Sequence, residues 1–248
     1  MDYNVNFEKE ADKLISLFKE LEEVIKNECK KCAIDTNEKS ISLLINELSK
    51  KNNIVRRNKD ELDLIRNVRN LNVHQQIDKY KYVVYPSPEI NNKLEMIINE
   101  IKNPPMIYYS EMCIKKSNMY CRKMNDSIYD TIQEMTKKLY THIPIIENGK
   151  LIGVFSENTL LDIVKRDNGI IIDEKTTFKD IEENLKIENH TMESFKFISK
   201  RKNIYDVEDM FKNYFGQHKR IGCIYITENG KENENILGML TAWDVLGN

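Results

Sequence analysis

The sequence predicts an α+β protein in which an N-terminal helical bundle is followed by two copies of a β-α-β-β-α unit. Three observations lead to this fold class. Apolar residues recur at helical spacing through the N-terminal third of the chain, and a motif repeats in the C-terminal half. Between the two parts, Asn103-Pro104-Pro105 closes a predicted helix, because proline cannot continue one.

The N-terminal bundle is predicted from apolar side chains spaced three and four residues apart. The first helix covers residues 7–30, the second is started by Thr36 with Lys39 and Ser40, and the third runs from about Asp60 into Gln75. A polar break, residues 50–53, separates the second from the third. Residues 88–102 are interpreted as a linker helix between the domains. Its apolar stripe is expected to support a homodimer and consists of Ile90, Leu94, Ile97, Ile98 and Ile101.

The C-terminal half contains an internal repeat. The segment Ile146-Glu147-Asn148-Gly149-Lys150 recurs as residues Ile226 to Lys231. The apolar run that follows the first segment recurs from Ile236 onward. The copies align with one gap, residues 232–235, which lengthens a polar turn. Upstream, Ile128-Tyr129-Asp130 recurs as Ile204-Tyr205-Asp206. Such a duplication indicates two small units that bury their apolar faces on each other, and the seam between them is a natural ligand site.

Each copy of the repeat predicts the same run of elements. Residues 119–124 and 196–200 suit short strands, and residues 126–140 and 203–215 have helical spacing. Two apolar strands then follow, joined by Glu-Asn-Gly, which is a strong hairpin signal because Asn and Gly tolerate positive φ. Last come a strand, a Ser or Thr, and a helix. The hydroxyl residue is expected to cap that helix and leave its first N–H groups available to an anion.

This order resembles the cystathionine-β-synthase (CBS) domain, which occurs in tandem pairs. His142-Ile143-Pro144-Ile145-Ile146, followed by Gly149, Leu151 and Gly153, carries the resemblance, which extends over roughly residues 106–248. It implies two units, 106–168 and 169–248, packed as a disc. It also implies a cleft for an adenosine-type regulatory ligand, namely AMP, ADP, ATP, S-adenosylmethionine or a cyclic dinucleotide.

The resemblance also implies which residues meet the ligand. In that family a Ser or Thr and an Asp three residues later contact phosphate and ribose. The second copy has both, as Thr241 and Asp244, and is expected to hold the better site. The first copy has Ser156, but Thr159 stands where the family has Asp.

Two basic positions near the expected cleft complete the set of binding candidates. His142 precedes the first hairpin strand and is expected to touch the ligand. Arg220, preceded by Lys219, begins the strand 220–226 and is expected to meet phosphate. The alternative is a CBS pair that only dimerises and binds nothing.

A second motif lies in the third helix. Arg69-Asn70-Leu71-Asn72-Val73-His74 resembles the signature helix of the HEPN superfamily (higher eukaryotes and prokaryotes nucleotide-binding). The resemblance covers roughly residues 1–80, within an expected domain of residues 1–85 joined to the CBS pair by a linker, 86–105. It implies RNA cleavage without metal in a cleft shared by two protomers. Arg69 would hold the scissile phosphate, His74 would transfer a proton, and Asn70 would orient groups.

Helix geometry limits how the residues of this second motif can act together. Asn70 and His74 are four residues apart and share a face, whereas Arg69 lies about 140° round the axis from His74. An enzyme therefore needs Arg69 and His74 to converge, for instance across a dimer axis. The alternative is a non-enzymatic module that binds a partner. Arg69 would then be a solvated or internally paired residue, and His74 would cap the helix end.

Composition limits the remaining classes of function. A net charge of −2, from 38 Lys and Arg against 40 Asp and Glu, provides no global field to attract nucleic acid. No apolar run approaches membrane length and no signal peptide is recognised, so we expect a cytoplasmic protein with reduced cysteines. Cys29-x-x-Cys32 has no second pair, so no metal site is expected. Single-stranded RNA is the candidate substrate of the helical domain.

Overall fold

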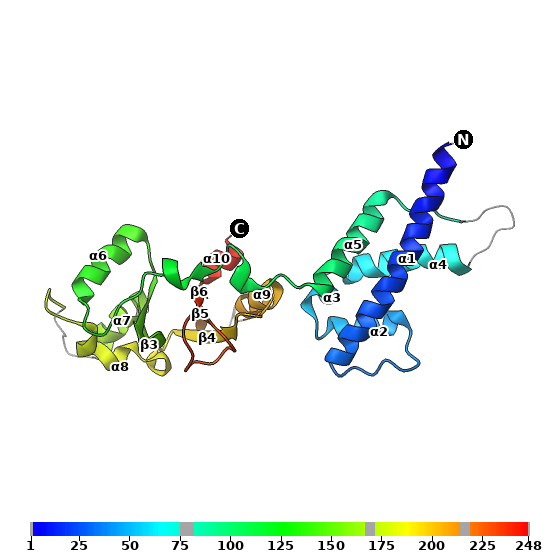
Figure 1. Cartoon of the computed structure of the whole chain (residues 1–248). Helices are drawn as coiled ribbons and strands as arrows, with labels where there is room; N and C mark the ends of the chain where they lie inside the picture. The colour runs from blue at the N-terminus through cyan, green and yellow to red at the C-terminus, as the bar shows by residue number, and fades with distance from the viewer. Residues whose placement is uncertain (1, 75–81, 167–171, 214–218, 248) are drawn as a thin grey trace. The chain divides into compact units, whose positions relative to one another are not determined.

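The computed structural model describes residues 2–74, 82–166, 172–213 and 219–247, and it separates into two compact units (Figure 1). Unit 1 is Met1–Pro104 and unit 2 is Pro105–Asn248. No helix in the described ranges has both the length and the apolar character that crossing a bilayer requires.

In the described part of unit 1, all regular secondary structure is helical. Its helices are α1 (Asp2–Lys31), α2 (Ile41–Ser49), α3 (Asn53–Arg57), α4 (Lys59–His74) and α5 (Pro88–Lys102). The second helix begins later than predicted, because Ser40 and not Thr36 is its cap, with Oγ accepting from the backbone N–H of Leu43. Helix α3 was not predicted. It occupies part of the expected polar break, because the Asn52 side chain caps it by accepting two backbone N–H bonds.

Helix α5 has the predicted bounds, but its apolar stripe does not face solvent. Leu94, Ile97, Ile98 and Ile101 are 0–3% exposed, and α5 packs against α1 inside unit 1. Asn91 reinforces this contact, with Nδ2 donating to the backbone carbonyl of Glu10 at 2.9 Å. The expectation of a free dimerisation stripe on a linker helix is therefore wrong. The chain covers these side chains itself, because they complete the core of the bundle.

Unit 2 contains the predicted element order twice. In the first copy, Arg122 pairs in parallel with Ile145, and then come α6 (Ile128–Lys138), β2 (His142–Glu147), β3 (Lys150–Ser156) and α7 (Glu157–Arg166). The elements of the second copy are β4 (Glu193–Ser199), α9 (Ile204–Asn213), β5 (Arg220–Thr227), β6 (Gly238–Leu240) and α10 (Ala242–Leu246). Strands β2 and β3 form one antiparallel sheet. In the other sheet β4 is parallel to β5, and β6 is antiparallel to both β5 and the short β1 (Ile114–Lys115).

The first hairpin turns where the sequence predicted. Asn148 and Gly149 join β2 to β3 with φ of 50° and 82°, the left-handed region that Asn and Gly reach most easily. The two-residue turn pairs Glu147 with Lys150. A register shift between Ile145 and Ile146 then sets His142, at the start of β2, opposite Ser156, at the end of β3. The predicted strand at 119–124 is reduced to the single parallel bridge at Arg122.

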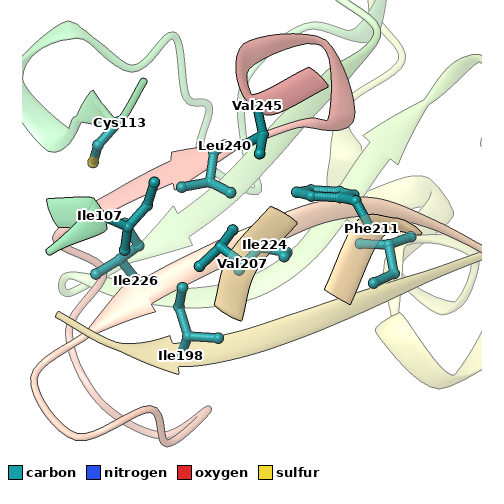
Figure 2. Close-up of a cluster of buried hydrophobic side chains, with 10 residues drawn as sticks. Ile107, Cys113, Ile198, Val207, Phe211, Ile224, Ile226, Leu240 and Val245 are labelled. Atoms are coloured by element: carbon teal, nitrogen blue, oxygen red, sulfur yellow. The ribbon is translucent and has the colours of Figure 1, made fainter. Parts of the chain in front are cut away.

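The segments that lead into the two copies pack on the opposite copy. Ile107 and Cys113, which precede the first copy, lie in the core of the second (Figure 2). That core also contains Ile198, Val207, Phe211, Ile221, Ile224, Ile226, Leu240 and Val245. In the same way Phe178, Ile181 and Leu185 precede the second copy but pack with the first. This exchange interlocks the two copies, and the start of α7 reaches β4 through the hydrogen bond from Asn158 to Glu193.

Candidate ligand-binding site

A cavity of about 560 Å³ lies where the end of the second copy meets the start of the first. This volume is in the range of about 300–1,000 Å³ typical of small-molecule sites. From the second copy come β6 and the first turn of α10. Opposite them lie the segment 114–120, which leads into the first copy, and the junction of α6 with β2. The lining residues are Ile114, Asn118, Met119, Tyr120, Lys138, Leu139, Tyr140, Thr141, His142, Met239, Thr241, Trp243 and Asp244.

Thr241 and Asp244 form the polar corner of this cavity. Thr241 caps α10, and Oδ2 of Asp244 accepts from its backbone N–H at 2.7 Å and from its hydroxyl at 2.8 Å. The second carboxylate oxygen, Oδ1, receives no hydrogen bond from any described residue. The structure thus holds the predicted pair together in the cavity wall with one acceptor to spare.

The rest of the wall is largely aromatic and apolar. The rings of Tyr120 and Tyr140 stack with centroids 5.4 Å apart, and the guanidinium of Arg122 lies 4.7 Å from the Tyr120 ring centroid. Trp243 is 81% exposed at the rim. Among the lining residues, Lys138 carries the positive charge and Asp244 the negative charge. Such a wall suits a flat, mostly neutral ring system with few polar attachments.

His142 lines the cavity and also reaches out of it. Its Nδ1 is 2.8 Å from the Thr141 hydroxyl, and its Nε2 is 3.0 Å from Oε2 of Glu193. Glu193 begins β4 in the second copy and is completely buried. Sequence reasoning selected His142 but missed Glu193, because a single Glu at the start of an apolar strand has no distinguishing spacing.

Glu193 is the centre of a buried polar cluster. Its Oε1 accepts from the Ser156 hydroxyl and lies 3.2 Å from Nδ1 of His190, and its Oε2 accepts from Nδ2 of Asn158 at 2.9 Å. We call these residues, with His142, the Glu193 cluster. Desolvation raises the pKa of the Glu193 carboxyl, but hydrogen bonds from His142 and His190 outweigh burial, and the pKa is far below its usual 4.5.

The other predicted binding residues lie outside the cavity wall. Ser156 and Thr159 are each 1% exposed and bond to each other, with the Ser156 backbone N–H donating to the Thr159 hydroxyl at 3.0 Å. Arg220 begins β5 and is exposed, and it too is absent from the wall. The structure therefore brings Thr241, Asp244 and His142 together, and it places Ser156 in the Glu193 cluster.

In unit 1 the three residues of the second motif lie on α4. The Arg69 guanidinium stacks 5.1 Å from the Phe18 ring centroid, and it approaches Glu22 of α1 at 3.9 Å. Its Nη1 donates to Oδ1 of Asn70 at 3.2 Å, while its buried Nε has no acceptor among the described residues. His74 is the last residue of α4, and its side chain lies outside the described residues.

Within the described ranges, His, Cys, Asp and Glu form no group of three or more that could hold a metal ion. Cys29 is buried, and its thiol donates to the carbonyl of Leu44. Burial is the main cause that raises the pKa of this thiol. A protonated, buried thiol of this kind packs as a small apolar group and is a poor nucleophile.

Comparison with known proteins identifies the first copy. Residues 123–166 match the family model of the CBS domain, so the chain carries a CBS domain there. No curated protein matches the chain. Solved structures that resemble it include three CBS proteins: a hemolysin-like protein containing a CBS domain from Oenococcus oeni PSU, the CBS domain pair of protein MJ0100 in complex with 5'-methylthioadenosine and S-adenosyl-L-methionine, and CBSX2 in complex with AMP.

Each of these three structures is 16% identical to the chain and covers 58% of it. The alignments span 90% of the O. oeni protein, 94% of the MJ0100 pair and 94% of CBSX2. The TM-scores are 0.37, 0.38 and 0.37 in the same order.

Proposed function

We propose that unit 2 is a regulatory module that binds one adenosine-type ligand in the cavity bounded by Thr241, Asp244 and His142. One observation carries the proposal. The pair Thr241 and Asp244, selected from the sequence alone, lines a cavity of suitable volume whose opposite wall comes from the copy that matches the CBS domain. CBS domains typically bind adenosine ligands in a regulatory role.

The chemistry of the cavity supports a nucleoside. A ribose has adjacent hydroxyl donors, and Oδ1 of Asp244 is an acceptor that the cap leaves over. An adenine ring is flat and largely apolar on its faces, which matches the side chains of Met119, Met239 and Tyr120. The single cation of the wall, Lys138, provides a partner for one phosphate.

Ligand that remains bound during purification tests this proposal directly. The native protein is denatured after gentle purification, and the released small molecules are identified by mass spectrometry. We expect an adenosine derivative in amounts close to one per chain, with AMP and 5'-methylthioadenosine as reference compounds. Recovery of a different ligand class, or failure of every adenosine derivative to bind the emptied protein, would contradict the proposal.

For unit 1 we propose a partner-binding helical module whose action depends on the ligand of unit 2. The other candidate is the metal-independent ribonuclease built on Arg69, Asn70 and His74. Arg69 packs on Phe18 and faces the carboxylate of Glu22, and this internal pairing favours a structural role for its guanidinium. The unmatched Nε is the feature that a phosphate would satisfy, so an RNA assay separates the two candidates.

Self-association remains part of the proposal in a changed form. The α5 stripe is covered within unit 1, so a homodimer must use other surfaces. Sedimentation of the full chain with and without AMP measures this. A ligand that regulates through assembly shifts the mass distribution, because it binds one assembly state more tightly than the other.

A further inference from the structure

The two copies invite a comparison of their equivalent sites. The repeat aligns Ile204 with Ile128. Glu193 precedes Ile204 by eleven residues, and Ser117 precedes Ile128 by eleven, so Glu193 corresponds to Ser117. Ser117 adjoins Asn118 of the cavity wall. Likewise Ser156, the last residue of β3, corresponds to Thr241, which follows β6. The corner that is open beside Thr241 therefore has a counterpart beside Ser156, and Glu193 lies in that counterpart.

Four polar side chains around this counterpart corner are directed at the Glu193 carboxylate. The hydroxyl of Ser156 and the amide of Asn158, both at the start of α7, donate to it, as described above. Nε2 of His142 and Nδ1 of His190 approach it from two other elements at 3.0 and 3.2 Å. Four donors around one fully buried carboxylate are what a bound anion would receive at this helix start.

His190 lies between the Glu193 carboxylate and a backbone carbonyl. His190 is 2% exposed, and its two ring nitrogens face two acceptors, Oε1 of Glu193 and the carbonyl oxygen of Leu185 at 3.4 Å. The Glu193 carboxylate thus has hydrogen-bonding partners on both of its oxygens, which is the condition for a charge to remain buried.

Strand β5 closes the last side of the cluster. At Gly222, an added Cβ would lie 2.8 Å from Nε2 of His142 and 3.2 Å from Oε2 of Glu193. The backbone of β5 can approach the imidazole and the carboxylate this closely only because residue 222 has no side chain. The counterpart corner is consequently filled on every side, with Glu193 at its centre.

We infer that Glu193 is a built-in anion that fills the first copy's ligand position, so that the cavity at Thr241 is the single ligand site among the described residues of the pair. This count of one rests on the proposed function of the open cavity. The assignment of Glu193 as an internal anion does not rest on the proposed function, because the four donors and the buried carboxylate define it. His142 links the two, since its ring lines the open cavity while its Nε2 is fixed by Glu193.

Rescue of a truncated side chain by a free carboxylate tests the inference. In the full chain, Glu193→Ala should lower the Tm by about 10 °C, because it leaves the four groups around the carboxylate without their partner. Sodium formate should then raise the Tm of Glu193→Ala in a saturable way, whereas sodium chloride at equal ionic strength should not. Wild type and Glu193→Gln, in which the position is still occupied, should respond equally to the two salts.

A formate response of the wild type as large as that of Glu193→Ala would overturn the inference, and so would a folded Glu193→Ala with no response. If the Ala variant unfolds in buffer, its refolding from urea is compared in formate and in chloride. Recovery in formate alone supports the built-in anion, and recovery in neither contradicts it. Calorimetry of wild type with AMP gives the count independently. Two sites per chain contradict the inference, whereas no binding contradicts the proposed function and leaves the formate result to decide the anion.

Discussion

Two Thr–Asp pairs in unit 2 have the same geometry but different surroundings. Oδ2 of Asp244 accepts two bonds from Thr241, and Oδ2 of Asp180 accepts two from Thr177, at 2.8 and 2.9 Å. Both pairs cap a short helix, but Asp244 lines the cavity and Asp180 does not. At the scale of single residues, the cap explains the local structure of both pairs. Only the position of Asp244 in the cavity wall distinguishes it as a candidate ligand contact. Asp180 is also the matched control for any change at Asp244.

The Glu193 carboxyl makes a prediction about acid stability. Because its pKa in the folded chain lies below the usual 4.5, its contribution to the free energy of unfolding is complete above about pH 4.5 and is lost as the pH falls. Urea unfolding of wild type and Glu193→Gln should therefore differ by a constant amount near pH 5, and the difference should shrink steadily below pH 4.5.

Wild type and Glu193→Gln share all their other carboxyls, so the contributions of those groups cancel in the difference between the two free energies of unfolding. A difference that grows on acidification would mean that Glu193 is protonated in the folded protein, and it would contradict the buried charge.

At the scale of elements, α5 shows how the same apolar stripe can serve two purposes. Its spacing predicted a helix with the observed bounds, Pro88–Lys102, but spacing does not say what covers the stripe. The structure shows the stripe packed within unit 1, where α1 lies against it. The stripe therefore contributes to the stability of unit 1 and not, as expected, to dimerisation.

Two substitutions on α5 separate stability from assembly. Ile98 is 3% exposed, and Ile98→Ala should lower the free energy of unfolding of unit 1 by about 2–5 kcal/mol, the cost of a core truncation. Met96 on the same helix is 62% exposed, and Met96→Ala should change it by less than about 0.5 kcal/mol. Urea unfolding measures both. Equal stability of the two variants, with a lower mass for Ile98→Ala in sedimentation, would restore the dimerisation stripe.

The predictable elements are those whose signal is local. The hairpin at Asn148-Gly149 follows from positive φ, and the end of α5 follows from Pro104. Helix α3 was missed because its cap at Asn52 lies in a run of polar residues that reads as a break. Glu193 was missed because its role depends on four donors from distant parts of the chain, and no spacing in the sequence brings those parts together.

At the scale of the whole molecule, the exchange of leading segments explains why unit 2 holds together as one body. Ile107 belongs to the core of the second copy, and Phe178 to the core of the first. Neither copy would retain a complete core alone, so the cavity between them exists only in the pair. The duplication was visible in the sequence, but the exchange was not, because residues 107–118 and 172–192 lie outside the repeated motif.

The RNA assay decides what unit 1 does. If it is a partner-binding module, wild type, Arg69→Ala and His74→Ala should show the same background cutting of a mixed RNA pool with chelator present, with and without AMP. Arg69→Ala should instead lower the stability of unit 1, because the contacts with Phe18 and Glu22 are lost. Loss of cutting by about 10²–10⁴-fold in both variants would establish the ribonuclease, since that is the usual contribution of proton transfer.

The most direct measurement of the central claim is calorimetric titration of AMP and 5'-methylthioadenosine into wild type, Asp244→Ala and Asp180→Ala. Asp244→Ala should weaken binding by about 5- to 150-fold, equivalent to about 1–3 kcal/mol for a lost hydrogen bond to a charged group. Asp180→Ala removes the same kind of cap and should bind as wild type does. If both variants bind as tightly as wild type, or if wild type binds neither compound, the cavity at Thr241 and Asp244 is not an adenosine site.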